Sequence, residues 1–206
     1  MPAVFPFHAI QYNNGAGDLS KKVAPPYDVL GADQKQALLD RDADNIVGID
    51  LPHVPAKELG PKSAYDGAAA KLCEMLEAGT LSRRETPAMF AYRQTFTVDG
   101  ASYMRCGMAC AVETKPLGPR EGGGVLPHEQ TFSGPKEDRM ALMRSTATQL
   151  SPIFGLHPDA DGAASSIIRD LTARGPAADT AALGAGVTHE IWTVDAAETL
   201  ARSTNA

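Results

Sequence analysis

The feature that most constrains the fold is a β-hairpin signal between residues 89 and 113. Apolar and polar residues alternate from Met89 to Val98, as they do along a half-buried strand. The dipeptide Asp99-Gly100 follows, and this pair is a strong signal for a two-residue hairpin turn. A return strand is therefore predicted from Ala101 to about Glu113.

Periodicity on both sides of the hairpin predicts further helices and strands. Apolar residues recur at three- and four-residue spacing over 61–78, which predicts a helix that Gly79 ends. Asp33 and Gln36 have capping-box spacing, which predicts a short helix through Asp40. We further predict strands over 4–10, 45–51, 150–156 and 189–194, helices over 135–146, 165–173 and 196–202, and a loose loop over 175–186. The pattern predicts a single α+β domain over residues 1–206, with a mixed or antiparallel sheet flanked by helices.

Composition excludes several classes of protein. The net charge of -6 and pI near 5.3 argue against a general nucleic-acid binder, which needs a basic face. No apolar run reaches the roughly 18 residues of a membrane-spanning helix. Cys106 and Cys110 would lie about 13 Å apart on one straight strand, too far for a disulfide. With Cys73 they predict reduced thiols and a cytoplasmic protein.

Reactive side chains are most concentrated in residues 126–139, Leu-Pro-His-Glu-Gln-Thr-Phe-Ser-Gly-Pro-Lys-Glu-Asp-Arg. Gly134-Pro135 is typical of a helix start, because proline fits the first helical position. Glu137 then falls where a carboxylate can reach back to free amides. His128 and Glu129 would lie just before this start.

The start of this predicted helix suits an anion. Backbone amides and the helix dipole favour negative charge there, and Lys136 and Arg139 would strengthen the preference. We therefore predict a phosphate-binding or phosphate-transferring site. The alternative is an ordinary solvated, charged first turn.

The segment Val23-Ala24-Pro25-Pro26-Tyr27-Asp28-Val29 is a second candidate part of the site. Two successive prolines hold the chain extended and present Tyr27 and Asp28 from a fixed loop. These two residues are predicted to form the wall of a ligand pocket. A stiff connector with Tyr27 packed on the core is the alternative.

The chain resembles the bacterial and archaeal domain-of-unknown-function family 1015. The resemblance rests on segments spread over almost the whole chain, in the family's order: 5–10, 23–29, 45–52, 92–96, His128-Glu129 with Thr131, 133–139 and 150–155. The family is distantly similar to the superfamily of ParB-type nucleotide-binding proteins and the ADP-dependent free serine kinase. That similarity implies an α+β fold that binds a nucleotide, and it permits phosphoryl transfer to a small molecule such as serine.

Length also enters the resemblance. Family members are typically about twice as long as this chain, and their second half carries an Asp-Gly-His-His-Arg motif similar to the kinase's catalytic segment. This sequence contains no such motif. The chain therefore resembles the N-terminal portion of a longer family member.

If the site transfers a phosphoryl group, the residues of 126–139 have the following predicted roles. Phosphoryl transfer needs cations on the phosphates and a base for the acceptor hydroxyl. Ser133, Gly134, Lys136 and Arg139 are the predicted phosphate-binding residues. The predicted catalytic residues are His128, Glu129 and Asp138, with His128 or Glu129 as the base. Glu129 or Asp138 is also the predicted ligand of Mg²⁺ accompanying ATP or ADP.

Other functions remain open at this stage. A nucleotide-responsive binding module without turnover would suit a chain that lacks the second motif. A metal-dependent hydrolase at His128 and Glu129 is disfavoured, because no His-x-x-x-His pair supplies further ligands. A Ser133 nucleophile is disfavoured, because Gly-x-Ser-x-Gly is absent.

Overall fold

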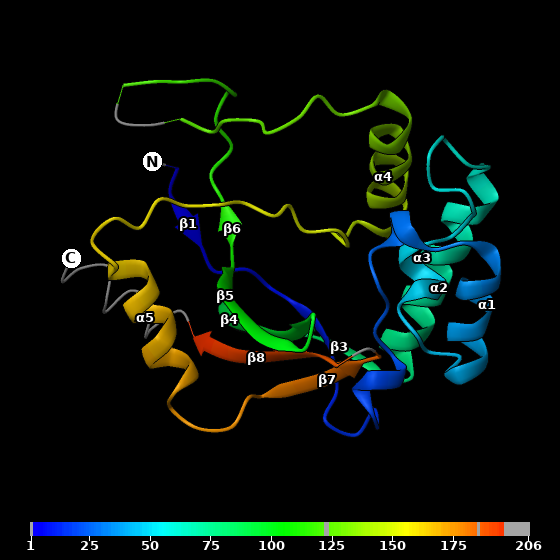
Figure 1. Cartoon of the computed structure of the whole chain (residues 1–206). Helices are drawn as coiled ribbons and strands as arrows, with labels where there is room; N and C mark the ends of the chain where they lie inside the picture. Colours follow the sequence, from blue (N-terminus) through cyan, green and yellow to red (C-terminus); the bar gives the residue numbers. More distant parts are fainter. Residues whose placement is uncertain (1, 122–123, 185, 196–206) are drawn as a thin grey trace. The chain divides into compact units, whose positions relative to one another are not determined.

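The computed structural model describes residues 2–121, 124–184 and 186–195 (Figure 1). The chain divides into two compact units, and each is discontinuous in sequence. Unit 1 comprises residues 1–11, 83–130 and 157–206, and unit 2 comprises residues 12–82 and 131–156. Each unit is described here by itself.

Unit 1 is built on an antiparallel four-stranded sheet with the strand order β5-β4-β8-β7 (Figure 1). Its strands are β4 (Ala88–Val98), β5 (Ala101–Ala109), β7 (Asp179–Leu183) and β8 (Val187–Asp195). The predicted hairpin is confirmed, since β4 pairs with β5 from Val98↔Ala101 to Phe90↔Ala109. Asp99 and Gly100 have φ values of 50° and 77°, as a tight turn with positive φ at both central positions requires.

One face of this sheet packs against helix α5 (Ala163–Thr172), close to the predicted helix over 165–173. The helix lies against β4, β5 and β8 (Figure 1). Leu171 from the helix joins Met89, Ala91, Trp192 and Val194 in a buried cluster. Alternation along the strands therefore places one apolar set under α5, as a period of two residues requires.

The first residues of the chain form two short strands where one strand over 4–10 was predicted. Strand β1 (Val4–Phe5) pairs with β6 (Ala111–Val112), and β2 (Ile10–Tyr12) pairs with β3 (Leu81–Arg83). Pro6 lies between β1 and an isolated bridge at Phe7. Proline has no amide hydrogen to donate, so it interrupts the ladder at this point.

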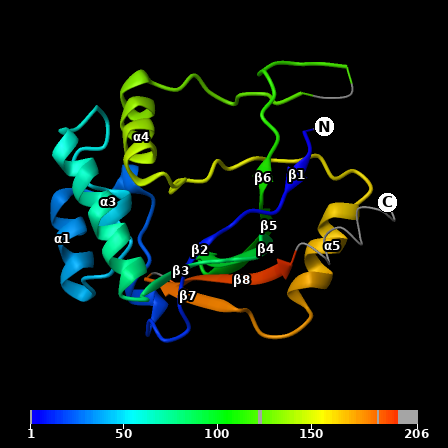
Figure 2. The same ribbon diagram turned by 180° about the vertical axis from the view of Figure 1, so that it is seen from behind.

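Unit 2 is helical (Figure 2). Its helices are α1 (Ala32–Arg41), α2 (Val47–Asp50), α3 (Lys62–Glu77) and α4 (Ser133–Thr146), with 3₁₀ turns η1 (Leu19–Lys21) and η2 (Tyr27–Val29). Helices α3 and α4 lie side by side although they are far apart in sequence (Figures 1 and 2). The predicted helices over 33–40, 61–78 and 135–146 are confirmed, with ends that differ by one or two residues.

The predicted strand over 45–51 is wrong. The oxygen Oδ1 of Asn45 accepts from the amide of Val47 at 3.0 Å, and its Nδ2 donates to the carbonyls of Lys21 and Val23. This buried asparagine fixes a turn that opens α2. Val47, Ile49 and Leu51 are all buried, so packing outweighs the strand preference of their side chains.

Other predictions also need correction. Helix α1 is capped by Gln34, whose Oε1 accepts from the amide of Gly31 at 2.8 Å, and Asp33 with Gln36 forms no capping box. Residues 179–183 form edge strand β7 where a loose loop was predicted. No strand forms over 150–156. The predicted helix over 196–202 lies outside the described residues.

The predicted α+β class with a long antiparallel hairpin is confirmed. Across the described ranges, the helices are too short or too polar to cross a bilayer.

Candidate functional site

A buried carboxylate organises the side chains of unit 2. Asp138 on α4 has no exposed surface. Its Oδ1 accepts from the Tyr65 hydroxyl at 2.7 Å and contacts His53 Nε2 at 2.6 Å. Its Oδ2 accepts from Nε and Nη2 of Arg139 at 2.9 and 2.7 Å. Burial alone raises the pKa of Asp138, but hydrogen bonds from Tyr65, His53 and Arg139 outweigh it and hold the pKa below its usual value.

Arg139 links this carboxylate to a second one. Its Nη1 donates to the backbone carbonyl of Asp50 at 2.6 Å and to Asp50 Oδ1 at 3.1 Å. Burial raises the pKa of Asp50, although Arg139 and the hydroxyl of Ser151 act in the opposite direction. The guanidinium also lies 3.9 Å from the centre of the Tyr27 ring. Arg139 is therefore engaged by two carboxylates and one aromatic ring.

The contact with Asp138 determines which nitrogen of His53 can act as a base. A carboxylate with a lowered pKa is ionised at neutral pH and can only accept hydrogen bonds. When the His53 ring is neutral, Nε2 therefore carries the hydrogen and the lone pair lies on Nδ1. In the described part of the chain no residue hydrogen-bonds to Nδ1, and 14% of the His53 side chain is exposed. Asp138 thus orients His53 as a carboxylate orients a catalytic imidazole.

Gly60 and Gly134 have no side chain at two points where the loop that carries His53 makes close contacts. A Cβ at Gly60 would lie 2.3 Å from Cδ2 of the His53 ring, so this position has room only for hydrogen. A Cβ at Gly134 would lie 2.3 Å from the carbonyl oxygen of Lys57. Gly134 precedes Asp138 by one helical turn and faces the same way. The loop from His53 to Gly60 therefore runs along the first turn of α4.

The start of α4 has no side-chain cap. The helix begins at Ser133, two residues earlier than Pro135. The amides of Ser133 and Gly134 precede the first amide that has an intrahelical acceptor. The side chains of Ser133 and Lys136 are exposed. Free amides, a hydroxyl and an ammonium group thus lie around one helix end.

The structure brings together three of the residues predicted from sequence. Asp138, Arg139 and Tyr27 meet in the buried cluster. Asp28 lies on η2 and is exposed.

His128 and Glu129 belong to unit 1, whereas residues 131–156 belong to unit 2. Both side chains are largely exposed, at 86% and 62%, and His128 Nε2 lies 3.6 Å from Glu129 Oε1. Their catalytic roles stay predictions.

The described residues offer little to a protein-held metal ion. Among them, no three His, Cys, Asp or Glu side chains gather closely enough to bind one. Both oxygens of Asp138 already accept hydrogen bonds within the chain. A Mg²⁺ ligand role for Asp138 or Glu129 stays a prediction, and in this arrangement the phosphates would have to supply most of the ion's ligands.

No role for His53 was predicted from the sequence. His53 and Asp138 are 85 residues apart, and no spacing motif connects them. The only local signal is the pair Pro52-His53 directly after the buried Leu51. Asp138 becomes recognisable as the partner of His53 only in the folded structure, where α4 packs against α3.

A family model described as "Protein of unknown function (DUF1015)" matches residues 4–206. Neither the curated proteins nor the solved structures contain a match.

Proposed function

The chain belongs to the DUF1015 family, and we propose that it binds the phosphate groups of a nucleotide at the start of α4 and transfers one phosphoryl group to a small-molecule hydroxyl. The observation that carries the proposal is the pair His53–Asp138, set beside an uncapped helix start. The proposed relationship to the ParB and free serine kinase superfamily fits the same chemistry.

His53 is the base of the proposed reaction. Nδ1 takes the proton of the acceptor hydroxyl, whose oxygen forms a bond to the terminal phosphorus of the nucleotide. The bond from that phosphorus to the bridging oxygen breaks, and the shortened nucleotide leaves with the electron pair. Asp138 holds the ring and stabilises the imidazolium as it forms. This role assigns to His53 the function predicted for His128 or Glu129.

The phosphates bind to groups other than Arg139 in this proposal. The donors of Arg139 are already directed to Asp50 and Asp138, and its charge is offset by these carboxylates. Lys136, the Ser133 hydroxyl and the free amides of the first turn supply the attraction. Arg139 instead fixes α4 in the position that brings Asp138 to His53. Arg139 is thus a positioning residue in the proposed reaction.

ATP or ADP with Mg²⁺ is the proposed nucleotide, and a cytoplasmic location belongs to the same proposal. The three cysteines are free thiols, which fits a reducing compartment. The alternative is a module that binds the nucleotide without turnover, and it is favoured by the engagement of Arg139 and Asp138 within the chain.

The test uses the full chain and measures binding and transfer separately. Calorimetry with MgATP and MgADP gives affinity, and nucleotide labelled on the terminal phosphate, incubated with serine and pooled hydroxyl amino acids, gives transfer. His53→Gln keeps an amide donor near Asp138 but removes the base. We expect it to lower transfer by about 10²–10⁴-fold with little change in affinity. Glu129→Gln tests the base predicted from sequence.

Lys136→Ala tests the phosphate site, with Lys62→Ala as its control. Lys62 is also an exposed lysine in the first turn of a helix, and within the part of the chain that the structure describes it pairs only with Asp66. We expect nucleotide affinity to fall for Lys136→Ala and to stay unchanged for Lys62→Ala. Binding without transfer by the wild-type chain would establish the binding module instead. Transfer that survives His53→Gln would remove His53 as the base, and absence of binding would overturn both functions.

A further inference from the structure

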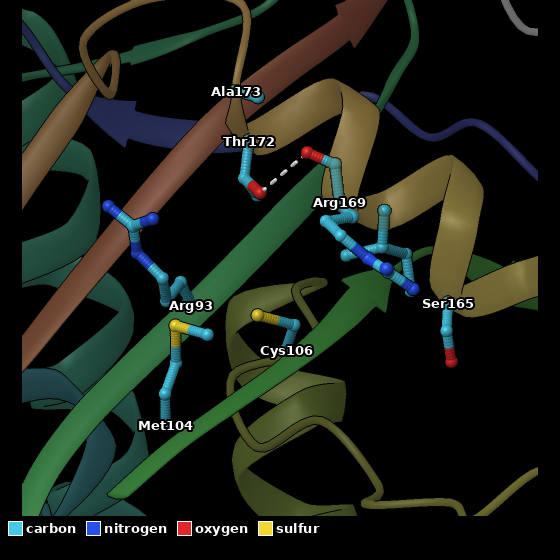
Figure 3. Close-up of a pocket in the computed structure, with 8 residues that line it drawn as sticks. Arg93, Met104, Cys106, Ser165, Arg169, Thr172 and Ala173 are labelled. Atoms are coloured by element: carbon cyan, nitrogen blue, oxygen red, sulfur yellow. Dashed lines mark hydrogen bonds between the residues drawn. The ribbon is translucent and has the colours of Figure 1, made fainter. Parts of the chain in front are cut away.

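Unit 1 contains a pocket to which no role has been assigned above. It is half-open, with a volume of about 440 Å³, and lies between α5 and the edge of the sheet formed by β4 and β5 (Figure 3). This volume is within the range of small-molecule sites. The lining residues are Arg93, Met104, Cys106, Ser165, Ile168, Arg169, Thr172 and Ala173.

One of the two arginines in this pocket is already neutralised. Nε and Nη2 of Arg93 donate to the two carboxylate oxygens of Glu190 at 2.7 and 2.8 Å. The guanidinium also lies 4.8 Å from the centre of the Trp192 ring. This bidentate pairing raises the pKa of Arg93 and lowers that of Glu190. Arg93 is therefore a fixed part of the wall and contributes little net charge.

Arg169, the second arginine of the pocket, is not paired with a carboxylate in the described part of the chain. Within the described ranges its guanidinium forms no hydrogen bond or ion pair, although its backbone carbonyl accepts from the Thr172 hydroxyl at 3.1 Å (Figure 3). The Ser165 hydroxyl donates to Asp159. Both hydroxyls of the pocket are thus occupied as donors. Arg169 leaves the pocket with one uncompensated positive charge.

The rest of the lining is apolar or weakly polar. Met104 and Cys106 project from β5 toward α5 (Figure 3). Ile168 on α5 and Ala173 directly after this helix contribute aliphatic groups to the lining. Met104 is 63% exposed. An exposed methionine adapts its shape to an apolar ligand.

We propose that this pocket binds a small organic monoanion whose carboxylate pairs with Arg169 and whose apolar body contacts Met104, Ile168 and Ala173. A guanidinium suits a carboxylate because its planar fork donates two parallel hydrogen bonds. The single uncompensated charge selects against neutral ligands. The pocket shares no residue with the proposed phosphate site, since all its lining residues belong to unit 1.

Cys106 provides a direct readout of occupancy. It lines the pocket and is exposed, so a bound ligand would shield its thiol from a soluble alkylating reagent. Cys73 on α3 in unit 2 is also exposed and serves as an internal reference in the same molecule. Peptide mass spectrometry separates the alkylation rates at the two cysteines.

The probes are benzoate and 4-methylpentanoate, each compared with its uncharged amide. A Kd on the order of 1 mM is expected for such small ligands. At about ten times Kd, roughly one site in eleven is free, so the rate at Cys106 should fall about tenfold. The rate at Cys73 should not change, and the amides should give little protection.

Arg169→Gln should abolish this protection, whereas Arg144→Gln should retain it. Arg144 is the matched control, because it is the basic residue in the last turn of α4 as Arg169 is in α5. Trp192 fluorescence verifies that unit 1 stays folded in both variants. The proposal is overturned if neither carboxylate protects Cys106, if the amides protect equally well, or if protection persists in Arg169→Gln.

Discussion

Asp138→Asn is the most informative single change to the buried cluster. The carboxylate accepts four hydrogen bonds, from His53, Tyr65 and, twice, Arg139. The replacement amide has one oxygen and one NH₂ group. Whichever way it is oriented, the NH₂ group faces donors, so one side of the cluster loses its acceptor.

The size of the effect follows from the burial of this group. Asp138 has no exposed surface, and removing one partner of a buried charged pair costs about 3–5 kcal/mol. This is a large fraction of the roughly 5–15 kcal/mol that stabilises a typical domain. For a chain of this length it corresponds to a fall in melting temperature of about 6–20 °C.

Two spectroscopic probes separate the two units. The helices α1–α4 all belong to unit 2, so far-UV circular dichroism reports mainly on that unit. The single tryptophan, Trp192, lies in the core of unit 1. We expect Asp138→Asn to lower the helical melting transition. The Trp192 transition tests whether unit 1 unfolds independently.

Asp66→Asn is the matched control for Asp138→Asn. Asp66 is a helical aspartate whose side chain is 52% exposed, and among the described residues it pairs only with Lys62. Exposed pairs contribute about 0–1 kcal/mol, so this change should lower the melting temperature by only a few degrees. Equal melting temperatures for Asp66→Asn and Asp138→Asn would refute the view that Asp138 organises unit 2.

Two further predictions concern the same region. Gly134→Ala places a Cβ 2.3 Å from the Lys57 carbonyl oxygen and should destabilise unit 2 by about 1–3 kcal/mol in urea denaturation. Gly67→Ala on α3, where a Cβ meets nothing within 4 Å, should instead stabilise it by about 0.5–1 kcal/mol, and the same sign for both would contradict the packing argument. Because the folded-state pKa of Asp138 is lowered, its contribution is fully present above the unfolded value of about 3.9 and is lost as pH falls through the folded value. The stability difference between wild type and Asp138→Asn should therefore be constant near neutral pH and shrink in acid, and a difference that grows as pH falls would contradict this sign.

Local signals predicted the parts of the fold that depend on near neighbours in sequence. The hairpin follows from alternation and from Asp99-Gly100, and the α3 helix follows from its apolar spacing and from Gly79, whose φ is 73°. Two segments depend on partners that the sequence does not indicate. Residues 45–51 form a helical turn because Asn45 binds carbonyls some 20 residues away. Strand β7 is held by backbone hydrogen bonds to β8. Its side chains are small and show no clear apolar alternation, so the sequence pattern did not predict a strand there.

In the candidate site, too, some residues could be predicted from local sequence, whereas their distant partners could not. Asp138, Arg139 and Tyr27 could be selected from their residue types, since charged and aromatic groups at a helix start and in a rigid loop suggest a site. Their actual partners, His53, Tyr65 and Asp50, could not, because each contact joins segments brought together by the packing of α4 on α3. Arg139 illustrates the limit: its charge suggested phosphate binding, which stays a prediction, and its contacts with Asp50 and Asp138 became visible only in the fold.

The discontinuous course of unit 2 sets the order in which it can be completed. The peptide carrying His53 and Tyr65 leaves the ribosome long before the one carrying Asp138, because the hairpin of unit 1 is synthesised between them. Until α4 emerges, the ring of His53 has no carboxylate to orient it. The nascent chain is therefore without the His53–Asp138 pair until the hairpin of unit 1 has already been made.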